Sequence, residues 1–297
     1  MLSQYTRTAF TYDGRSKAVY VRGKGPAVVV MHEIPGITPQ VIRFADWVVD
    51  AGFRVYMPEL VGTAGREVSW RYMAESMARV CISREFRLLA AHRSSPVTDW
   101  LRALVRHAHE EAGGRGVGAI GMCLTGNFAL ALMMEPALMA PVLSQPSLPG
   151  SIDAAHRAAL HISPAELECV KERCARGDKV LGLRFQGDPM CPPERFETLR
   201  RELGNAFEGI EIEDRHANRE TVLPTPHSVV TNHLIDRAGE PTRAAADRVI
   251  EFFRERLLKP RRSKRSATKS ATKKKARRPS LRGESVSTTG KSPPAHE

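Results

Sequence analysis

The sequence has few cysteines, and their spacing matches neither a metal site nor a disulfide framework. It contains five cysteines among 297 residues, an odd number, and no two of them form a CxxC pair. Cys169 and Cys174 are five residues apart on an expected helix, but no second pair and no nearby histidine pair completes a zinc site. The pattern argues against a metal centre and favours buried thiols in a reducing compartment, so we expect a cytoplasmic protein.

The sequence also lacks a long apolar run. Residues 1–20 are polar and mixed, without the apolar core of a signal peptide. The longest apolar stretch, 119–143, contains Asn127, Glu135 and two prolines, so no membrane span is expected. The sequence shows no internal repeat.

Positive charge is concentrated at the end of the chain. The net charge is +12, and residues 259–297 carry 13 Lys or Arg against two Glu, so residues 1–258 are nearly neutral. The segment 259–297 has too few apolar residues to offset the entropy of ordering, and we expect a disordered basic tail after a single catalytic domain over 1–258. Such a tail either binds nucleic acid or another acidic partner without specificity, or has no partner and only keeps the protein soluble.

Short apolar runs alternate with longer amphipathic segments along the rest of the chain. Strands are predicted over 18–22, 27–32, 54–57, 117–120, 138–143, 180–185 and 210–212, and helices over 40–51, 96–112, 126–134, 193–203 and 242–257. This alternation predicts an α/β fold with a mostly parallel sheet covered by helices on both faces. Catalytic residues should then follow the carboxyl ends of strands. Segment 144–165 is expected to form a long loop or a small excursion over the site.

The segment Gly121–Gly126, with the sequence GMCLTG, follows a predicted strand and opens an apolar helix. A nucleophile on such a turn sits on a sharp bend, and small neighbours let the backbone approach itself, as in the G-x-S-x-G elbow. Here Cys123 replaces the serine, and the helix N-terminus favours its thiolate. The alternative is a buried structural cysteine beside a tight turn.

An acid and a base should follow the nucleophile in the order acid, then histidine. Asp188 comes directly after a predicted strand, whereas its rival Asp178 precedes that strand and belongs to the other edge of the sheet. His227 lies on a loop ahead of the closing helix, with His216 and His233 as rivals. The alternatives are a turn aspartate in a Gly-Asp-Pro sequence and a surface histidine.

An acyl-transfer site also needs two N–H donors for the oxyanion. Leu124, directly after the nucleophile, is one candidate, and Ile34 is the other, because Pro35 in the same loop has no N–H. Glu33 would then stand close to Cys123. The alternative is a solvated loop glutamate.

At these residues the chain resembles the dienelactone hydrolase (carboxymethylenebutenolidase) family, over roughly residues 27–257. The likeness rests on Glu33–Gly36, Gly121–Leu124, Gly187–Asp188 and His227–Ser228, in that order. The resemblance implies an α/β-hydrolase fold with an eight-stranded sheet, a Cys-His-Asp triad and no cofactor. It also implies a glutamate that pairs with the resting thiol, and Glu33 is at the matching position.

The chain departs from the family pattern at two places in the site. Thr125 stands where the family elbow usually has glycine. The family also uses two arginines for a substrate carboxylate: Arg84 matches the first, but the second position, four residues after the histidine, is Thr231. We therefore expect a small-molecule ester or lactone substrate, with at most a modest preference for an acidic one.

These residues together predict a cysteine-dependent hydrolase. Cys123 attacks the carbonyl, His227 relays the proton and Asp188 orients the ring. The alternatives are a carboxylesterase or thioesterase of wider range, or a catalytically dead hydrolase body with a nucleic-acid-binding tail. The intact set of three residues argues against the dead body.

Overall fold

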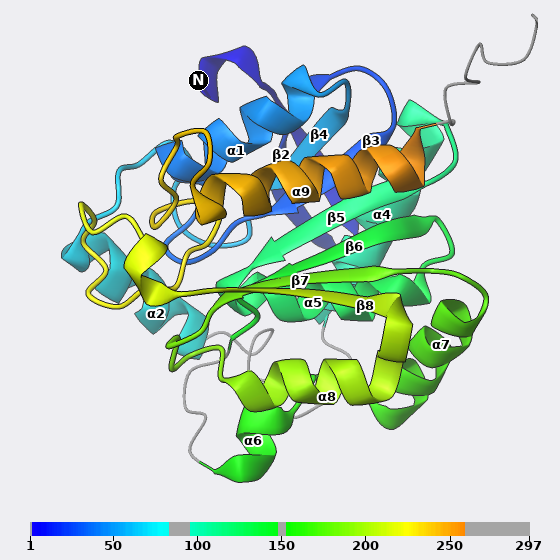
Figure 1. Cartoon of the computed structure of the whole chain (residues 1–297). Helices are drawn as coiled ribbons and strands as arrows, with labels where there is room; N and C mark the ends of the chain where they lie inside the picture. The colour runs from blue at the N-terminus through cyan, green and yellow to red at the C-terminus, as the bar shows by residue number, and fades with distance from the viewer. Residues whose placement is uncertain (1, 83–95, 148–152, 259–297) are drawn as a thin grey trace, which may run out of the picture. The chain divides into compact units, whose positions relative to one another are not determined.

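The computed structural model describes residues 2–82, 96–147 and 153–258 (Figure 1). At its centre is an eight-stranded sheet with the strand order β1-β2-β4-β3-β5-β6-β7-β8. The strands are β1 Thr6–Tyr12, β2 Arg15–Gly23, β3 Ala27–Met31, β4 Arg54–Pro58, β5 Val117–Met122, β6 Leu138–Ser144, β7 Val180–Phe185 and β8 Phe207–Ile212. Strands β3 to β8 are parallel, while β1 and β2 are antiparallel additions at one edge. The predicted α/β-hydrolase fold is confirmed.

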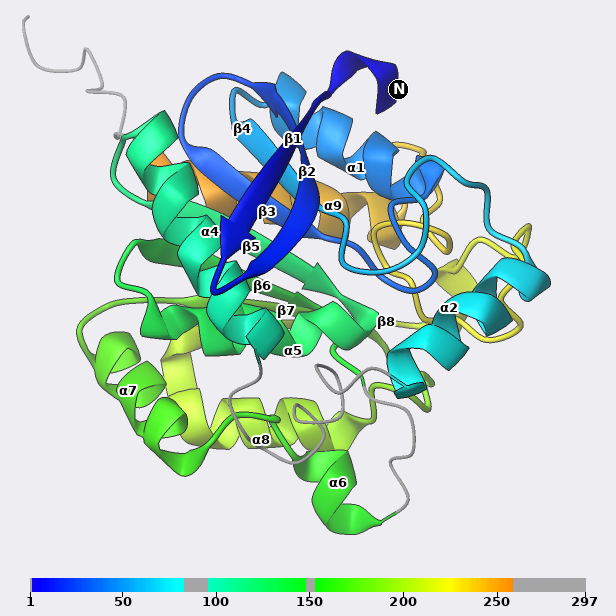
Figure 2. The same cartoon turned by 180° about the vertical axis from the view of Figure 1, so that it is seen from behind.

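Helices cover both faces of this sheet, as Figures 1 and 2 show. They are α1 Pro39–Asp50, α2 Trp70–Ile82, α4 Pro96–Ala112, α5 Gly126–Ala131, α6 Ala154–Ala158, α7 Pro164–Ala175, α8 Pro193–Leu203 and α9 Pro241–Leu257. Helices α1 and α9 pack on one face, and α4, α5, α7 and α8 on the other. Five of these helices begin at a proline, whose fixed φ suits the first helical position and whose missing N–H costs nothing there.

Each face of the sheet has its own apolar core. In β3, Val28 and Val30 join the core under α1 and α9, while Val29 and Met31 join the core on the opposite face. This alternation follows from the pleat of a strand that is buried on both sides, which explains the nearly continuous valine run. The central strands are thereby fixed in register, and so are the loops that leave their carboxyl ends.

Four parts of the chain differ from the sequence prediction. Strand β1 and helix α2 were not expected, and the longer β2 starts at Arg15 instead of residue 18. Segment 144–165, expected as a loop or excursion, contains α6 and the start of α7, with 148–152 outside the described residues. Strand β1 is exposed along almost its whole length, so it lacks the apolar alternation that identifies a strand.

The catalytic residues expected from the sequence all belong to one compact unit, Met1–Lys259. In the described parts of the chain, no helix combines the length and apolar character that crossing a membrane requires. The predicted tail, 259–297, lies outside the described residues.

Candidate active site

The predicted nucleophile, acid and base follow three strands of the parallel part of the sheet. Cys123 comes directly after β5, Asp188 is the third residue after β7, and His227 lies on the chain between β8 and α9. Because β5, β6, β7 and β8 are parallel, their carboxyl ends meet at one edge of the sheet. The fold therefore brings residues that are 104 positions apart in the chain to the same place.

The turn at Cys123 has the strained geometry of a nucleophile elbow. Cys123 has a φ of +56°, a left-handed conformation that is uncommon outside glycine. A side chain at Gly121 would place its Cβ 2.0 Å from the carbonyl oxygen of Thr125, and one at Gly126 would come within 2.8 Å of Pro146 Cα. Both glycines are therefore required by close backbone approach, as the GMCLTG motif predicted.

Thr125 fits the elbow because its hydroxyl finds partners there. Its Oγ1 accepts from the backbone N–H of Met122 at 2.9 Å. The same oxygen lies 3.1 Å from the carbonyl oxygens of Met31 and His32, to which it can donate its one proton. The hydroxyl therefore ties the elbow after β5 to the loop after β3, and this accounts for a threonine where the family usually has glycine.

His227 and Asp188 form a short, buried hydrogen bond. Nδ1 of His227 lies 2.6 Å from Oδ2 of Asp188, and the two residues are 3% and 1% exposed. Oδ1 of Asp188 accepts from the N–H of Met190 at 3.0 Å, so both carboxylate oxygens are engaged. With Nδ1–H donating to Asp188, Nε2 is the nitrogen left to accept a proton. Within the described residues this buried Nε2 has no aligned hydrogen-bond partner.

The electrostatic surroundings of His227 favour its charged form. Burial lowers the pKa of His227, but the negative charges of the Cys123 thiolate and of Asp188 outweigh it, so the pKa is raised well above its usual value. This direction means that a proton moved from the sulfur to the ring is stabilised there. The arrangement can therefore hold a thiolate–imidazolium pair.

The rival acid and base residues have other partners. Asp178 forms ion pairs with Arg173 at 2.8 Å and with Arg256 at 2.6 Å, before β7 begins. His216 belongs to the 3-10 turn Asp214–His216, where its Nε2 accepts from the neighbouring arginine. None of these bonds joins Asp178 or His216 to the residues around Cys123.

Two buried histidines support the loops of the site in their neutral forms. Nδ1 of His233 accepts from the N–H groups of residues 227 and 228 at 3.2 and 3.1 Å. Nε2 of His32 accepts from the N–H groups of residues 60 and 61 at 3.0 and 3.3 Å. Burial lowers the pKa of each to about 4, which keeps the accepting nitrogen free of a proton. His233 therefore holds the loop after β8, and His32 joins the loop after β3 to the one after β4.

Glu33 is buried, 2% exposed, and receives four side-chain donors. Oε2 accepts from Ser228 Oγ at 2.7 Å and from Gln145 Nε2 at 3.2 Å. Oε1 accepts from Asn232 Nδ2 at 2.9 Å and from the hydroxyl of Thr231. Three of these donors belong to the loop that carries His227, so the carboxylate anchors that loop.

These contacts bear on three predicted roles. In the described residues, Glu33 has no hydrogen bond to Cys123, and the sulfur instead lies 3.4 Å from Ser147 Oγ. Thr231, expected at the substrate carboxylate, is buried and directs its hydroxyl at Glu33. Arg84 lies outside the described residues.

The two expected oxyanion donors lie at the ends of adjacent strands. Strands β3 and β5 pair in parallel with Met31 opposite Gly121, so the loop containing Ile34 and the turn containing Leu124 leave the sheet side by side. Ile34 and Leu124 are both buried. The strand pairing therefore brings Ile34 and Leu124 to neighbouring turns at the edge of the sheet that carries Cys123.

Comparison with known proteins agrees with this geometry. The model of the dienelactone hydrolase family matches residues 11–161, which is just over half of the chain. The chain belongs to the dienelactone hydrolase family. The matched range contains Glu33 and Cys123 and ends before Asp188 and His227, so the structure alone brings the last two residues to the elbow. No curated protein matches the chain.

Solved structures with similar folds include other members of this group. A provisionally assigned dienelactone hydrolase from Klebsiella pneumoniae subsp. pneumoniae MGH 78578 has 17% identity and a TM-score of 0.56, over 84% of this chain and 97% of that one. The metagenomic P91, a dienelactone hydrolase-like promiscuous phosphotriesterase, has 16% identity and a TM-score of 0.53 over 85% and 98%. The dienelactone hydrolase of Anabaena variabilis ATCC 29413 has 16% identity and a TM-score of 0.50 over 86% and 99%. At these identities the likeness concerns the fold.

Gln145 and Ser147 are site residues of this family member that the sequence analysis missed. They follow β6, the strand between β5 and β7, so they reach the same edge of the sheet as the triad. Gln145 has a φ of +36°, a further strained position at this edge. The rule that selected Asp188, a polar residue just past a strand end, could have identified both.

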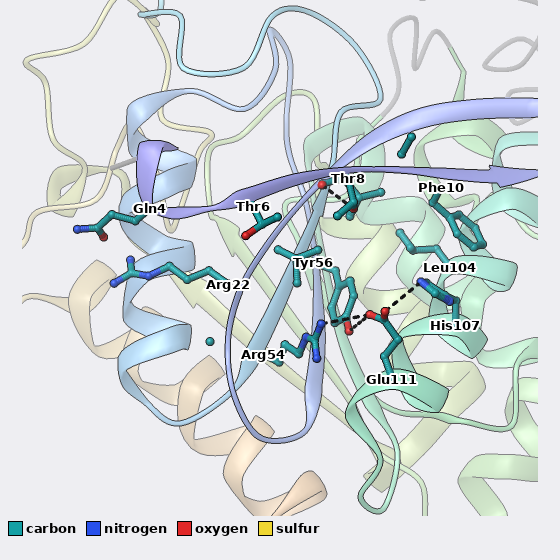
Figure 3. Close-up of a pocket in the computed structure, with 14 residues that line it drawn as sticks. Gln4, Thr6, Thr8, Phe10, Arg22, Arg54, Tyr56, Leu104, His107 and Glu111 are labelled. Atoms are coloured by element: carbon teal, nitrogen blue, oxygen red, sulfur yellow. Dashed lines mark hydrogen bonds and ion pairs between the residues drawn. The ribbon is translucent and has the colours of Figure 1, made fainter.

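A large pocket elsewhere contains none of the predicted site residues. It has a volume of about 550 Å³ and lies between β1, β2, β4 and α4 (Figure 3). Glu111 in this pocket accepts from Tyr56 at 2.7 Å and forms an ion pair with Arg54 at 3.3 Å. Across the described residues, no cluster of three or more His, Cys, Asp or Glu could hold a metal ion.

Proposed function

We propose that this dienelactone hydrolase family member is a cysteine-dependent hydrolase of carboxylic esters or lactones. The observation that carries the proposal is the 2.6 Å hydrogen bond between Asp188 and His227, which leaves Nε2 of the ring for the proton of Cys123. The strained φ of Cys123 at the carboxyl end of β5 supports the same assignment.

The residues support a two-step acyl transfer. His227 Nε2 takes the thiol proton, and the Cys123 thiolate attacks the carbonyl carbon to form a tetrahedral oxyanion. The N–H groups of Leu124 and Ile34 stabilise that oxyanion. Its collapse breaks the ester C–O bond, and the leaving alkoxide takes the proton from His227. Water then attacks the thioester with His227 as base, the C–S bond breaks, and the carboxylic acid and free thiol are released.

The side chains around Glu33 favour a substrate without a required carboxylate. The family's second arginine position is Thr231, and its hydroxyl is bound to Glu33. A neutral hydroxyl that is already engaged offers little to an acidic substrate. We therefore propose that neutral esters and lactones are accepted, with a wider carboxylesterase or thioesterase range as the second candidate.

A substrate screen with two variants tests the proposal. Purified protein should hydrolyse 4-nitrophenyl esters, a simple aryl lactone and a thioester at measurable rates, and Cys123→Ala should lose at least about a thousandfold in kcat. Cys191→Ala is the matched control, because this thiol is buried and has its pKa raised by burial, which makes it inert. Hydrolysis by Cys123→Ala at near wild-type rate would contradict the assignment of the nucleophile.

The basic segment 259–297 carries a separate proposal. We propose that it contributes nothing to catalysis and that any binding to nucleic acid is non-specific and strongly salt-dependent. Truncation after Leu258 should leave ester hydrolysis unchanged and abolish retention on DNA at low salt. Equal retention of the truncated and full chains would exclude this role for the segment.

A further inference from the structure

The sulfur of Cys123 has a hydroxyl neighbour that the proposed mechanism does not use. Ser147 Oγ lies 3.4 Å from Cys123 Sγ, within hydrogen-bonding distance for sulfur, and Ser147 is 2% exposed. A buried hydroxyl beside a thiol can donate to the thiolate and thereby favour the charged form.

Ser147 is held in this position by bonds that do not involve the sulfur. Its backbone N–H donates to the carbonyl oxygen of Cys123 at 3.1 Å, and its own carbonyl accepts from Asn127 Nδ2 at 2.9 Å. Gly126 allows the approach, since a Cβ there would come within 2.8 Å of Pro146 Cα. The hydroxyl is therefore placed beside the elbow before the sulfur carries any charge, which is the condition for preorganised stabilisation.

The hydroxyl has one proton and two acceptors. Besides the sulfur, its oxygen lies 3.0 Å from the carbonyl oxygen of Gln145. While Cys123 is a neutral thiol, the carbonyl is the better acceptor. Once the sulfur is a thiolate, the charge-assisted bond to sulfur is the stronger one, so the hydroxyl changes acceptor with the charge of the sulfur.

Glu33 is not free for this task. Its two oxygens already receive Gln145, Ser228, Thr231 and Asn232. With four side-chain partners, three of them on the loop of His227, this carboxylate is engaged in holding that loop and has no hydrogen bond to the sulfur among the described residues.

We propose that Ser147 is the hydrogen-bond donor to the Cys123 thiolate and that Glu33 acts only as a positioning residue for the loop of His227. This inference rests on the proposed function and adds a group to it. In acylation the proton passes from sulfur to His227 Nε2 and Ser147 turns to the thiolate. The Ser147 hydroxyl turns back to the Gln145 carbonyl oxygen when the S–C bond forms. In deacylation the C–S bond breaks, and Ser147 donates to the departing thiolate until His227 reprotonates it.

Alkylation of Cys123 by iodoacetamide across a pH series tests the inference, with the peptide containing Cys123 quantified by mass spectrometry. Ser147→Ala should move the pH of half-maximal alkylation upward by about one unit. Glu33→Gln should lower the melting temperature, because its four donors then face an amide. It should not move the pH of half-maximal alkylation. Thr198→Ala, which removes a buried hydroxyl that has no hydrogen-bond partner within the described residues, is the matched control.

Ser147→Gly also removes the hydroxyl and guards against a loss of stability in Ser147→Ala. The result is taken from whichever of the two variants keeps the melting temperature of the wild type. An unmoved midpoint in that variant would overturn the inference, as would a shift in Glu33→Gln equal to that in Ser147→Ala. Alkylation does not need turnover, so the test is independent of the proposed function. A shifted midpoint together with full hydrolysis by Cys123→Ala would sink the proposed function and leave the pairing of Ser147 with the sulfur in place.

Discussion

The proposed nucleophile and the proposed base of this site are held by different kinds of interaction. On the nucleophile side, Cys123 is fixed by backbone sterics: a left-handed φ and glycines at positions 121 and 126 that leave no room for a side chain. On the base side, the loop of His227 has no regular secondary structure and is fastened by polar side chains to Glu33 and by its N–H groups to His233.

The two sides also differ in how far apart in sequence their partners are. The strained φ of Cys123 and the contact between Gly121 and Thr125 arise within one short segment, whereas Glu33 binds Ser228, Thr231 and Asn232 across separations of 195 to 199 positions. Backbone strain is insensitive to pH, while a network of buried polar groups depends on the protonation of each member. The base side should therefore be the part that fails first under mild perturbation.

The largest effect is expected from the acid that joins the base to the sheet. Asp188→Asn should lower kcat about ten-thousandfold, because the amide no longer fixes the Nδ1–H tautomer of His227. The control is Asp178→Asn, which breaks the ion pairs with Arg173 and Arg256 and should cost stability without a comparable loss in kcat. Steady-state rates on one neutral ester compare the two, and similar losses in both variants would rule out the special position of Asp188.

A single methyl group at Gly121 should destabilise the turn that carries Cys123. Gly121→Ala should lower the free energy of unfolding by about 3 kcal/mol or more, since its Cβ would meet a backbone oxygen at 2.0 Å. At Gly52, with a φ of +96° and open space around the added Cβ, the same change should cost only about 1–2 kcal/mol of backbone strain. Urea unfolding of both variants measures the difference. Equal costs would show that crowding at the elbow is relieved by local movement.

The difference between the sides also explains what could be predicted from the sequence. The elbow, Asp188 and the order of the triad follow from local patterns and from the rule that sites lie at strand ends. The donors to Glu33 could not be predicted in this way, because Ser228 and Asn232 are loop residues that meet Glu33 only in the folded chain. Gln145 and Ser147 could have been predicted, because they are polar residues that come just after a predicted strand.

The missed edge of the sheet also had a signal. Strand β1 is polar, but the turn that joins it to β2 is Asp13–Gly14, with φ values of +48° and +71°. An Asp-Gly pair with two positive φ angles is the usual turn of a two-residue hairpin. Helix α2 follows Ser69, whose hydroxyl accepts from Tyr72 N–H at 3.2 Å, another local signal of a helix start.

Acid should weaken the loops that the two buried histidines support. The pKa of His32 and of His233 is about 4 in the folded protein and about 6.5 when unfolded, so above pH 6.5 both states are neutral. Between pH 6.5 and 4 the unfolded state binds protons that the folded state does not, and stability falls as the pH falls. His227 has the opposite sign, because its raised pKa gives stability that is lost only as pH rises.

For His32 the free energy of unfolding should fall by about 2 kcal/mol at pH 5, because this pH is 1.5 units below the pKa of the unfolded state. Denaturant unfolding at pH 7.5 and pH 5.0 measures it, and His32→Gln should flatten the dependence while lowering stability at pH 7.5. A pH dependence in His32→Gln that equals that of the wild type would contradict the neutral, buried assignment of the His32 ring.

The smallest effect separates two roles of Thr231. If its hydroxyl serves Glu33, as the contact indicates, Thr231→Val should lower the unfolding free energy by about 1–2 kcal/mol and leave the ratio of kcat/KM for an acidic and a neutral ester unchanged. If Thr231 instead binds a substrate carboxylate, that ratio should fall severalfold and stability should change little. Thr198→Val is the control, since its buried hydroxyl finds no hydrogen-bond partner in the described part of the chain and its loss should cost nothing. A changed ratio with unchanged stability would assign the Thr231 hydroxyl to the substrate, and Ser228 and Asn232 would then be the donors that join the loop of His227 to Glu33.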